Sequence, residues 1–274
     1  MSSEEPPRPV LLTDELRAQL NSVSTATLTN QLQRKGIRST FLSGLKPIKP
    51  GQRMLGYAHT LRYVPLREDL NSQYTSGMNA QRRAIESMAP EEVLVIEARG
   101  VPDAGTFGDV FALRALRRGA TGVITDGAVR DTPAVAELDI AVYHQASHAA
   151  TFGRQHMPLE HQIPIACAGV TVMPGDIVVG DGEGAVIIPP SLVVELAAAS
   201  VQQEAEEAWA LERVDAGEST TGVGGNGGGA ILLVAVDGSK EEVGANALTI
   251  ERVINENGGF DVHSSIITHH SSIK

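Results

Sequence analysis

Two carboxylates and one arginine are spaced so that they could act together in binding or catalysis. Asp109 is followed by twenty residues and then by Arg130 and Asp131. Asp131 would offer a hard oxygen ligand to Mg²⁺ or Mn²⁺, ions that keep several waters and need few protein ligands. Arg130 would offer a planar fork to a carboxylate or to a neighbouring carbonyl oxygen. An Asp before a helix is also a common N-cap, and an Arg-Asp pair is often a surface ion pair. Together the three residues favour a metal-assisted site for a small carboxylate ligand.

The predicted elements bring these residues to one edge of a sheet. Asp109 lies where a glycine-rich loop enters a predicted helix, and Arg130 follows a buried strand predicted over residues 122–125. Because one strand–helix repeat separates the two loops, both should meet where open α/β sheets collect their ligands. The backbone N–H groups of residues 109–111 open the helix and can hold a carboxylate.

The placement of lysine argues against Schiff-base chemistry. No lysine occurs between Lys49 and Lys240, where the candidate site residues lie. A Schiff base needs a lysine amine whose pKa is lowered in a desolvated pocket. We therefore expect a metal ion to serve as the electron sink.

Other motifs in the chain are weaker. The glycines of the segment 222–227 match the dinucleotide-binding pattern, but a polar stretch precedes them where a strand is required. His144 and His148 have helical spacing without the glutamate of a zinc-binding HExxH motif, and His156 and His161 flank a proline in an expected loop. Neither NAD nor a histidine-bound zinc is expected.

Composition excludes several classes of function. The formal net charge is -11 without a Lys/Arg-rich run, which disfavours binding to nucleic acid. Apolar runs are too short to span a bilayer, and the N-terminus lacks the features of a signal peptide. The single cysteine, Cys167, excludes an internal disulfide and is expected in the core. These features predict a soluble, cytoplasmic protein.

The order of the predicted elements indicates one α/β domain over residues 13–216. Two short helices come first, strands cluster later, and a long helix after Pro190 runs to about Val214. This order favours a layered domain with a mixed sheet. Residues 1–12 read as a disordered arm, 217–229 as a glycine-rich linker, and 230–274 as an appended tail of unknown role.

The central motifs resemble those of a known family. Gly108-Asp109, the twenty-residue spacer, TDGAVRD (125–131) and PGDIVVGDGEGAVIIP (174–189) resemble the class II pyruvate aldolases that act on 4-hydroxy-4-methyl-2-oxoglutarate. That family also contains the regulator of ribonuclease activity A, and the similarity covers roughly residues 10–216. It implies a three-layer β/β/α fold and a trimer or hexamer with active sites at subunit boundaries. Its catalytic members also decarboxylate oxaloacetate.

The resemblance also assigns roles. Asp131 matches the metal ligand, Arg130 the residue that contacts pyruvate, and Asp109 an acid that acts through water. Substrate-binding positions of the helix-entry loop are Gly108, Val110 and Phe111. An acid on the neighbouring subunit's C-terminal helix would order metal-bound water; the candidate is Glu206, with Glu204 and Glu207 as alternatives.

One position departs from the family pattern. The aldolases carry an acid three residues after the metal ligand, where this chain has Ala134. Glu137, three residues further on, could face the same way on a helix. The departure leaves the substrate beyond its 2-oxo acid end open.

The sequence therefore predicts a metal-dependent lyase that cleaves a 4-hydroxy-2-oxo acid to pyruvate and a second carbonyl compound. Metal and Arg130 would stabilise the enolate that forms as the C3–C4 bond breaks. Loss of CO2 from oxaloacetate would pass through the same enolate. Two alternatives stay open: a non-enzymatic regulator that binds a protein partner, and a related metal-dependent lyase or hydratase on a sugar acid.

Overall fold

The computed structural model describes residues 10–217. The chain divides into two compact units, Met1–Trp209 and Ala210–Lys274, and the account below concerns the first. The predicted linker and tail lie outside the described residues, apart from Gly217, as does most of the predicted N-terminal arm. The end of that arm is held to the domain, because the hydroxyl of Tyr57 accepts from the N–H of Leu12 at 2.8 Å and donates to the carbonyl of Val10.

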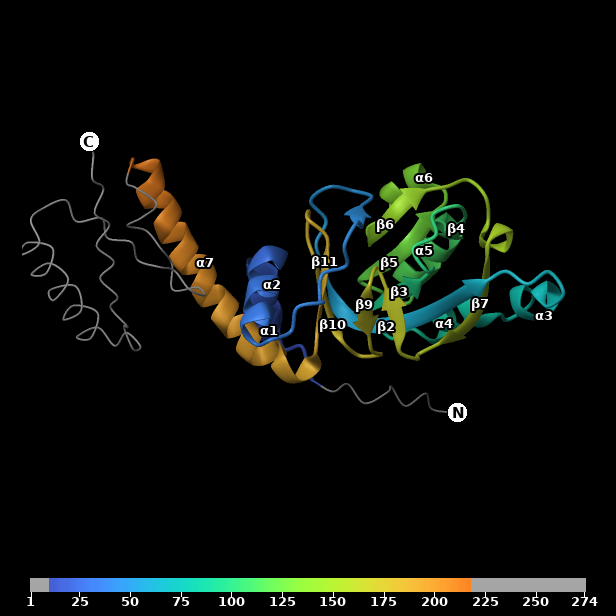
Figure 1. Ribbon diagram of the computed structural model, residues 1–274, viewed down its shortest axis with the longest axis horizontal. Helices are drawn as coiled ribbons and strands as arrows, with labels where there is room; N and C mark the ends of the chain where they lie inside the picture. The colour runs from blue at the N-terminus through green and yellow to red at the C-terminus, as the bar shows by residue number, and fades with distance from the viewer. Residues whose placement is uncertain (1–9, 218–274) are drawn as a thin grey trace, which may run out of the picture. The chain divides into compact units, whose positions relative to one another are not determined.

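Two short helices open the domain as predicted (Figure 1). Helix α1 (Asp14–Ser22) begins after Thr13, whose side chain accepts from the N–H of Leu16. Helix α2 (Thr25–Arg34) begins after Ser24, which caps it in the same way. Both caps satisfy N–H groups that lack an intrahelical acceptor.

A mixed sheet forms the centre of the fold. Within the described residues its nine strands follow the order β1-β6-β5-β3-β2-β10-β11, with β4 beside β5 and β7 beside β2. Strands β2, β3, β5 and β6 are parallel, whereas β1, β7, β10 and β11 are antiparallel to their neighbours. The strands are β1 (Lys46–Pro47), β2 (Met54–Pro65), β3 (Glu92–Glu97), β4 (Gly105–Phe107), β5 (Gly122–Val129), β6 (Ala141–Ser147), β7 (His156–His161), β10 (Ile177–Gly180) and β11 (Ala185–Ile188).

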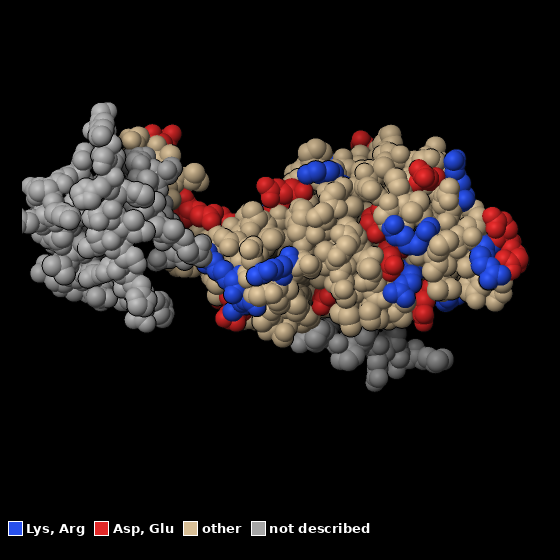
Figure 2. All heavy atoms as spheres, in the orientation of Figure 1, with Lys and Arg blue, Asp and Glu red and all other residues tan. Residues whose placement is uncertain are grey.

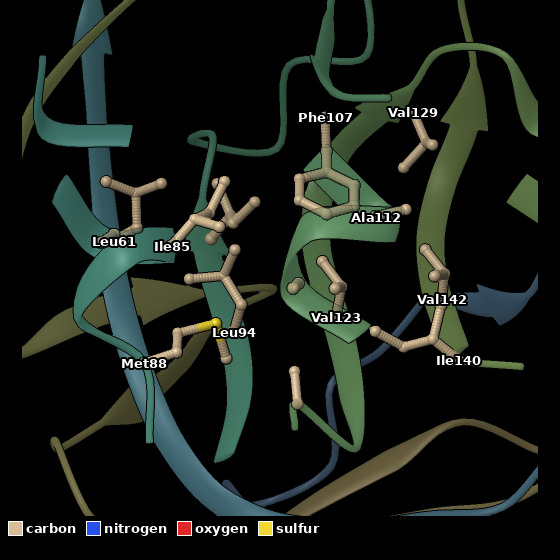
Figure 3. Close-up of a cluster of buried hydrophobic side chains, with 14 of the residues drawn as sticks. Leu61, Ile85, Met88, Leu94, Phe107, Ala112, Val123, Val129, Ile140 and Val142 are labelled. Atoms are coloured by element: carbon tan, nitrogen blue, oxygen red, sulfur yellow. The ribbon is translucent and has the colours of Figure 1, made fainter. Parts of the chain in front are cut away.

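Helices cover one face of this sheet, and a small hairpin covers the other. Helices α4 (Ala80–Ser87) and α5 (Asp109–Arg117) pack through a cluster that includes Ile85, Leu94 and Val123 (Figure 3). The next residues along β3 and β5 point the opposite way, toward the hairpin of β8 (Ile165–Cys167) and β9 (Val170–Val172). Both faces of the central strands are buried, which explains their continuous apolar runs. The predicted three-layer arrangement is confirmed.

Helix α7 (Val193–Asp215) closes the fold after a 3-10 turn (Pro190–Leu192). Its first half packs with α1 and α2 over the β10–β11 hairpin through a third apolar cluster. Asp181, in the turn of that hairpin, accepts from the N–H of Thr25 at 2.7 Å and so fixes the start of α2. Gln31 on α2 donates to Gln203 on α7 at 2.8 Å. No helix in the described range is long and apolar enough to cross a membrane.

The prediction of a loop around His156 and His161 is wrong, because these residues begin and end strand β7. Pro158 lies inside the strand, opposite Tyr63, where the register with β2 shifts. Since β7 pairs with β2 alone among the described strands, it is an edge strand, and a proline without an N–H is tolerated there. The short helices α3 (Asn71–Thr75), α6 (Thr132–Ala136) and η1 (Phe152–Arg154) complete the described part of the chain.

On the face shown in Figure 2, basic side chains lie among acidic ones rather than in a single patch. A phosphate backbone would need a continuous positive surface. This face offers none among the described residues.

Candidate active site

A cavity of about 240 Å³ lies where β4 and β5 end. Six of its lining residues were predicted from the sequence: Gly108, Asp109, Val110, Phe111, Arg130 and Asp131. The other six were not: Gln81, Gly105, Thr106, Phe107, Thr151 and Phe152. The strand–helix repeat thus brings the two predicted loops together in one place.

Strand pairing sets the distance between the two loops. Strand β4 runs parallel to β5, and the N–H of Arg130 donates to the carbonyl of Phe107 at 2.7 Å. A Cβ at Gly105 would lie 2.1 Å from Cγ of Arg130, so only glycine leaves room for the arginine side chain there. The backbone of β4 therefore determines where the guanidinium can lie.

Helix α5 presents its N-terminus to the cavity. It begins at Asp109, and its N-cap is Gly108, which has no side chain to satisfy the first N–H groups. The carboxylate of Asp109 accepts from the N–H of Val110 at 2.7 Å. The first-turn N–H groups of a helix have no intrahelical acceptors and carry the positive end of its dipole, so this edge of the cavity favours an anion.

Asp131 has a left-handed backbone conformation, with φ 54° and ψ 33°. It stands at the N-cap position of α6, yet within the described part of the chain its carboxylate makes no capping hydrogen bond. The alternative role of a simple N-cap is therefore not the one seen. Asp and Asn adopt this conformation more readily than other non-glycine residues.

Arg130 and Asp131 are neighbours without forming a tight ion pair. Nη2 of Arg130 lies 3.9 Å from Oδ1 of Asp131, and the two side chains are 35% and 41% exposed. A pair this exposed contributes at most about 1 kcal/mol. Nε of Arg130 is buried and has no hydrogen-bond partner among residues 10–217. The guanidinium thus keeps donors for an anionic ligand.

The donor set fits Mg²⁺ or Mn²⁺ better than zinc. Among the described residues there is no group of three or more His, Cys, Asp or Glu side chains that could hold a metal ion. A structural or catalytic zinc needs three or four such ligands, whereas Mg²⁺ accepts one or two carboxylates and several waters. The carboxylate of Asp131, which caps no helix among the described residues, could supply one such ligand to Mg²⁺ or Mn²⁺.

The other predicted acids lie elsewhere in the subunit. Glu206 does not line the cavity, and its carboxylate accepts from Gln202 on the surface of α7. Glu204 accepts from the N–H of Ser24 at 2.8 Å and so holds the start of α2. Glu207 accepts from Gln203. Because Glu204 holds another element of its own subunit, whereas the partners of Glu206 and Glu207 lie on α7 itself, Glu206 and Glu207 are the better candidates to reach a neighbouring subunit.

The position that departs from the aldolase pattern is also outside the cavity. Ala134 is exposed on α6, and Glu137 follows the helix as its C-cap. Neither Ala134 nor Glu137 lines the cavity of this subunit.

Asp126, inside the TDGAVRD motif, has a structural role. Its carboxylate accepts from the N–H groups of Ala98, Gly100 and Ala168. The next residue, Gly127, packs so closely that a Cβ there would lie 2.6 Å from Cβ of Ala98. These contacts fix the end of β5, after which Arg130 follows. The motif therefore contains residues that hold the strand in place as well as candidate site residues.

Comparison with known proteins agrees with this geometry. Residues 25–187 match the RraA-like family model, described as Aldolase/RraA. The chain belongs to the Aldolase/RraA family. The match includes every predicted residue of the cavity and excludes only Glu204, Glu206 and Glu207 among the predicted site residues.

Individual relatives are distant. The chain is 28% identical over 172 residues to a protein of Halalkalibacterium halodurans named "Putative 4-hydroxy-4-methyl-2-oxoglutarate aldolase". The matched segment covers 62% of this chain and 75% of that protein. It is 29% identical over 181 residues to protein DlpA of Legionella pneumophila, covering 66% of this chain but only 28% of DlpA. The chain thus spans less than a third of that relative.

A solved structure supports the fold of this Aldolase/RraA member. RraAS2 of Streptomyces coelicolor, described as an unusual member of the RNase ES inhibitor RraA protein family, superposes with a TM-score of 0.68. It is 32% identical, and the match covers 76% of this chain and all of RraAS2. The family therefore includes proteins named for catalysis and proteins named for regulation.

Proposed function

We propose that this protein is a divalent-metal-dependent lyase that cleaves a 4-hydroxy-2-oxo acid to pyruvate and a second carbonyl compound, and that also decarboxylates oxaloacetate. One observation carries the proposal. A single cavity gathers the uncommitted carboxylate of Asp131, the guanidinium of Arg130 and the N-terminus of α5. The name of the Halalkalibacterium halodurans relative supports the same reaction class.

The 2-oxo acid end of the substrate is bound by this chain's own groups. The N–H groups at the start of α5 receive the substrate carboxylate: that of Phe111 directly, and that of Val110 in exchange for its hydrogen bond to the carboxylate of Asp109. Arg130 donates from its fork to that carboxylate or to the 2-oxo oxygen. Asp131 would hold Mg²⁺ or Mn²⁺, which when bound supplies Lewis acidity at the 2-oxo carbonyl.

Bond cleavage follows from this arrangement. As the C3–C4 bond breaks, its electron pair moves into the enolate of pyruvate, and Arg130 stabilises the negative charge that develops on oxygen. Asp109, on the cavity edge, orders a water that takes the proton of the 4-hydroxyl group. The 4-hydroxyl carbon leaves as a carbonyl, and C3 gains a proton to give pyruvate. Oxaloacetate loses CO2 to reach the same enolate.

The site is completed by a neighbouring copy in this proposal. The protein assembles as a trimer or hexamer, and Glu206 of an adjacent α7 helps to order the water beside Asp109. We place Glu206 in this role because, among the described residues, its carboxylate has one hydrogen-bond partner, Gln202 on the surface of the same helix. Threefold closure is one of the common symmetries of homo-oligomers.

The decisive experiment measures pyruvate release from oxaloacetate with added Mg²⁺ or Mn²⁺. Activity should disappear with a chelator and fall with oxalate, which mimics the enolate of pyruvate. The free metal ion at the same concentration is the control, because it decarboxylates oxaloacetate slowly by itself. A rate equal to that of the free ion would contradict the proposal.

A second candidate function is inhibition of a ribonuclease through protein contact. The similarity to RraAS2, at 32% identity, favours it. Addition of this protein to an RNase E-type enzyme with a labelled RNA substrate tests it directly. Inhibition that survives Asp131→Asn, together with no oxaloacetate decarboxylation, would favour regulation over catalysis.

A further inference from the structure

The cavity has a charged rim and an uncharged interior. Asp131 is exposed, and Asp109 and Arg130 are partly exposed, so the charges lie toward solvent. Thr106 and Gln81 are almost fully buried, at 0% and 1% exposure. The substrate's 2-oxo acid end belongs with the charges, which leaves the interior for the group carried on C4.

Aromatic rings form much of that interior. Phe107 is buried, and its ring centroid lies 6.4 Å from that of Phe111. Phe152 lines the cavity beside Tyr63, with 5.8 Å between the ring centroids. Rings at these separations present a fixed apolar wall, which favours a compact apolar group.

Gln81 also lines the cavity, and its side chain is buried there. Its Nε2 donates to the carbonyl of Thr106 at 2.7 Å. Because a carbonyl oxygen can only accept, this contact fixes which end of the amide is nitrogen. The Oε1 atom is buried and has no hydrogen-bond partner in the described range. An acceptor left in this state costs about 1–3 kcal/mol, which a ligand that donates to it would recover.

The interior is unsuited to a second carboxylate. Among the described residues of this subunit that line the cavity, Arg130 is the one basic side chain, and the 2-oxo acid end already requires it. A carboxylate on C4 would face aromatic rings and the Oε1 acceptor, and a buried charge without a partner is strongly disfavoured.

We propose that the site prefers 4-hydroxy-2-oxo acids whose group on C4 is small and uncharged and bears a hydroxyl that donates to Gln81. This preference rests on the proposed lyase function. It departs from 4-hydroxy-4-methyl-2-oxoglutarate, the compound in the relative's name, which carries a carboxylate at that end. The cleavage itself is unchanged: pyruvate forms from C1–C3, and C4 leaves as an aldehyde.

Three substrates of equal carbon number test the proposal. They are 4,5-dihydroxy-2-oxopentanoate, 4-hydroxy-2-oxopentanoate and 4-hydroxy-2-oxoglutarate, whose C5 is a CH2OH, a methyl and a carboxylate group. Cleavage would release glycolaldehyde, acetaldehyde and glyoxylate. We expect kcat/KM to be highest for the CH2OH substrate and lowest, by at least about tenfold, for the carboxylate.

Two variants isolate the role of Gln81. Gln81→Leu should lower kcat/KM for the CH2OH substrate about tenfold more than it lowers kcat/KM for the methyl substrate. The wall should persist, because the carbonyl of Thr106 keeps the hydroxyl of Tyr63 as a donor at 3.2 Å. Gln33→Leu, on the exposed side of α2, is the matched control.

A separate measurement distinguishes failure of the proposed lyase function from failure of the substrate preference. Exchange of the pyruvate methyl hydrogens in D2O, followed by NMR with Mg²⁺, reports enolate formation without any group on C4. No exchange and no cleavage of any of the three substrates would overturn the lyase function and this preference with it. If exchange is seen but the carboxylate substrate is cleaved as efficiently as the CH2OH substrate, the preference alone is overturned. The same holds if Gln81→Leu lowers kcat/KM equally for all three substrates.

Discussion

The carboxylate of Asp131 occupies the space that a side chain at position 108 would need. A Cβ built on Gly108 would lie 3.0 Å from Oδ2 of Asp131. The backbone at Gly108 is extended, with φ -152° and ψ -176°, so its conformation is open to any residue. Glycine is therefore favoured at this position by the nearby carboxylate of Asp131 and by nothing in its own backbone.

Gly108→Ala should weaken metal binding while the fold persists. The added methyl group would push the Asp131 carboxylate by a few tenths of an ångström, and the flexible side chain can yield. We expect the Mg²⁺ concentration for half-maximal decarboxylation to rise about tenfold, a change of ~1.4 kcal/mol. Gly182→Ala is the control, since a Cβ there meets nothing within 4 Å. Unchanged metal dependence in Gly108→Ala would argue against Asp131 as the ligand.

Arg130→Lys and Asp131→Asn should each abolish most activity and leave stability close to that of the parent. A lysine point charge cannot reproduce the planar fork, and loss of one transition-state donor costs ~10²–10³-fold in rate. Asparagine tolerates the left-handed conformation of Asp131 but lacks the charge that Mg²⁺ requires. Decarboxylation rates and thermal unfolding midpoints check both expectations. An Asp131→Asn variant as active as the parent would remove the proposed metal site.

Much of the site could be predicted from sequence because its residues follow two consecutive predicted strand–helix turns. Asp109, Arg130 and Asp131 needed only the rule that such loops meet at one sheet edge. Strand β4 was missed, since three residues that include a glycine and a threonine show no periodicity. Gln81 gave no signal, because a glutamine beside Arg82 and Arg83 looks like the polar face of a helix.

Acid should weaken the fold through Asp181. Burial by itself would raise the pKa of this carboxyl, but hydrogen bonds from Thr25 and Glu183 and the charge of Arg53 hold it below its usual value. A folded-state pKa below the unfolded one gives stability that is present above the unfolded pKa, about 3.9, and is lost as pH falls through the folded pKa. The advantage of the parent over Asp181→Asn should therefore begin to shrink below about pH 4 and continue to shrink as pH falls through the folded pKa.

Urea unfolding at pH 7, 5 and 3.5 measures this difference. At pH 7 the substitution should cost about 1–3 kcal/mol, because the amide of asparagine cannot accept every bond that the carboxylate receives. Asp139→Asn, at an exposed position after α6, should change little at any pH. A cost for Asp181→Asn that stays constant down to pH 3.5 would mean that the carboxylate form contributes nothing.

Mixed oligomers provide the sharpest test of a site shared between subunits. Asp131→Asn and Glu206→Gln should each be nearly inactive alone, because every site then lacks one component. In co-expressed mixed trimers, a site is intact when one subunit supplies Asp131 and its neighbour supplies Glu206. Equal random mixing should therefore restore about a quarter of the parent activity. Replacing Glu206→Gln by Glu207→Gln shows which acid reaches across. A mixture that is no more active than either variant alone would place the whole site in one subunit. A protein that sediments as a monomer and is fully active would do the same.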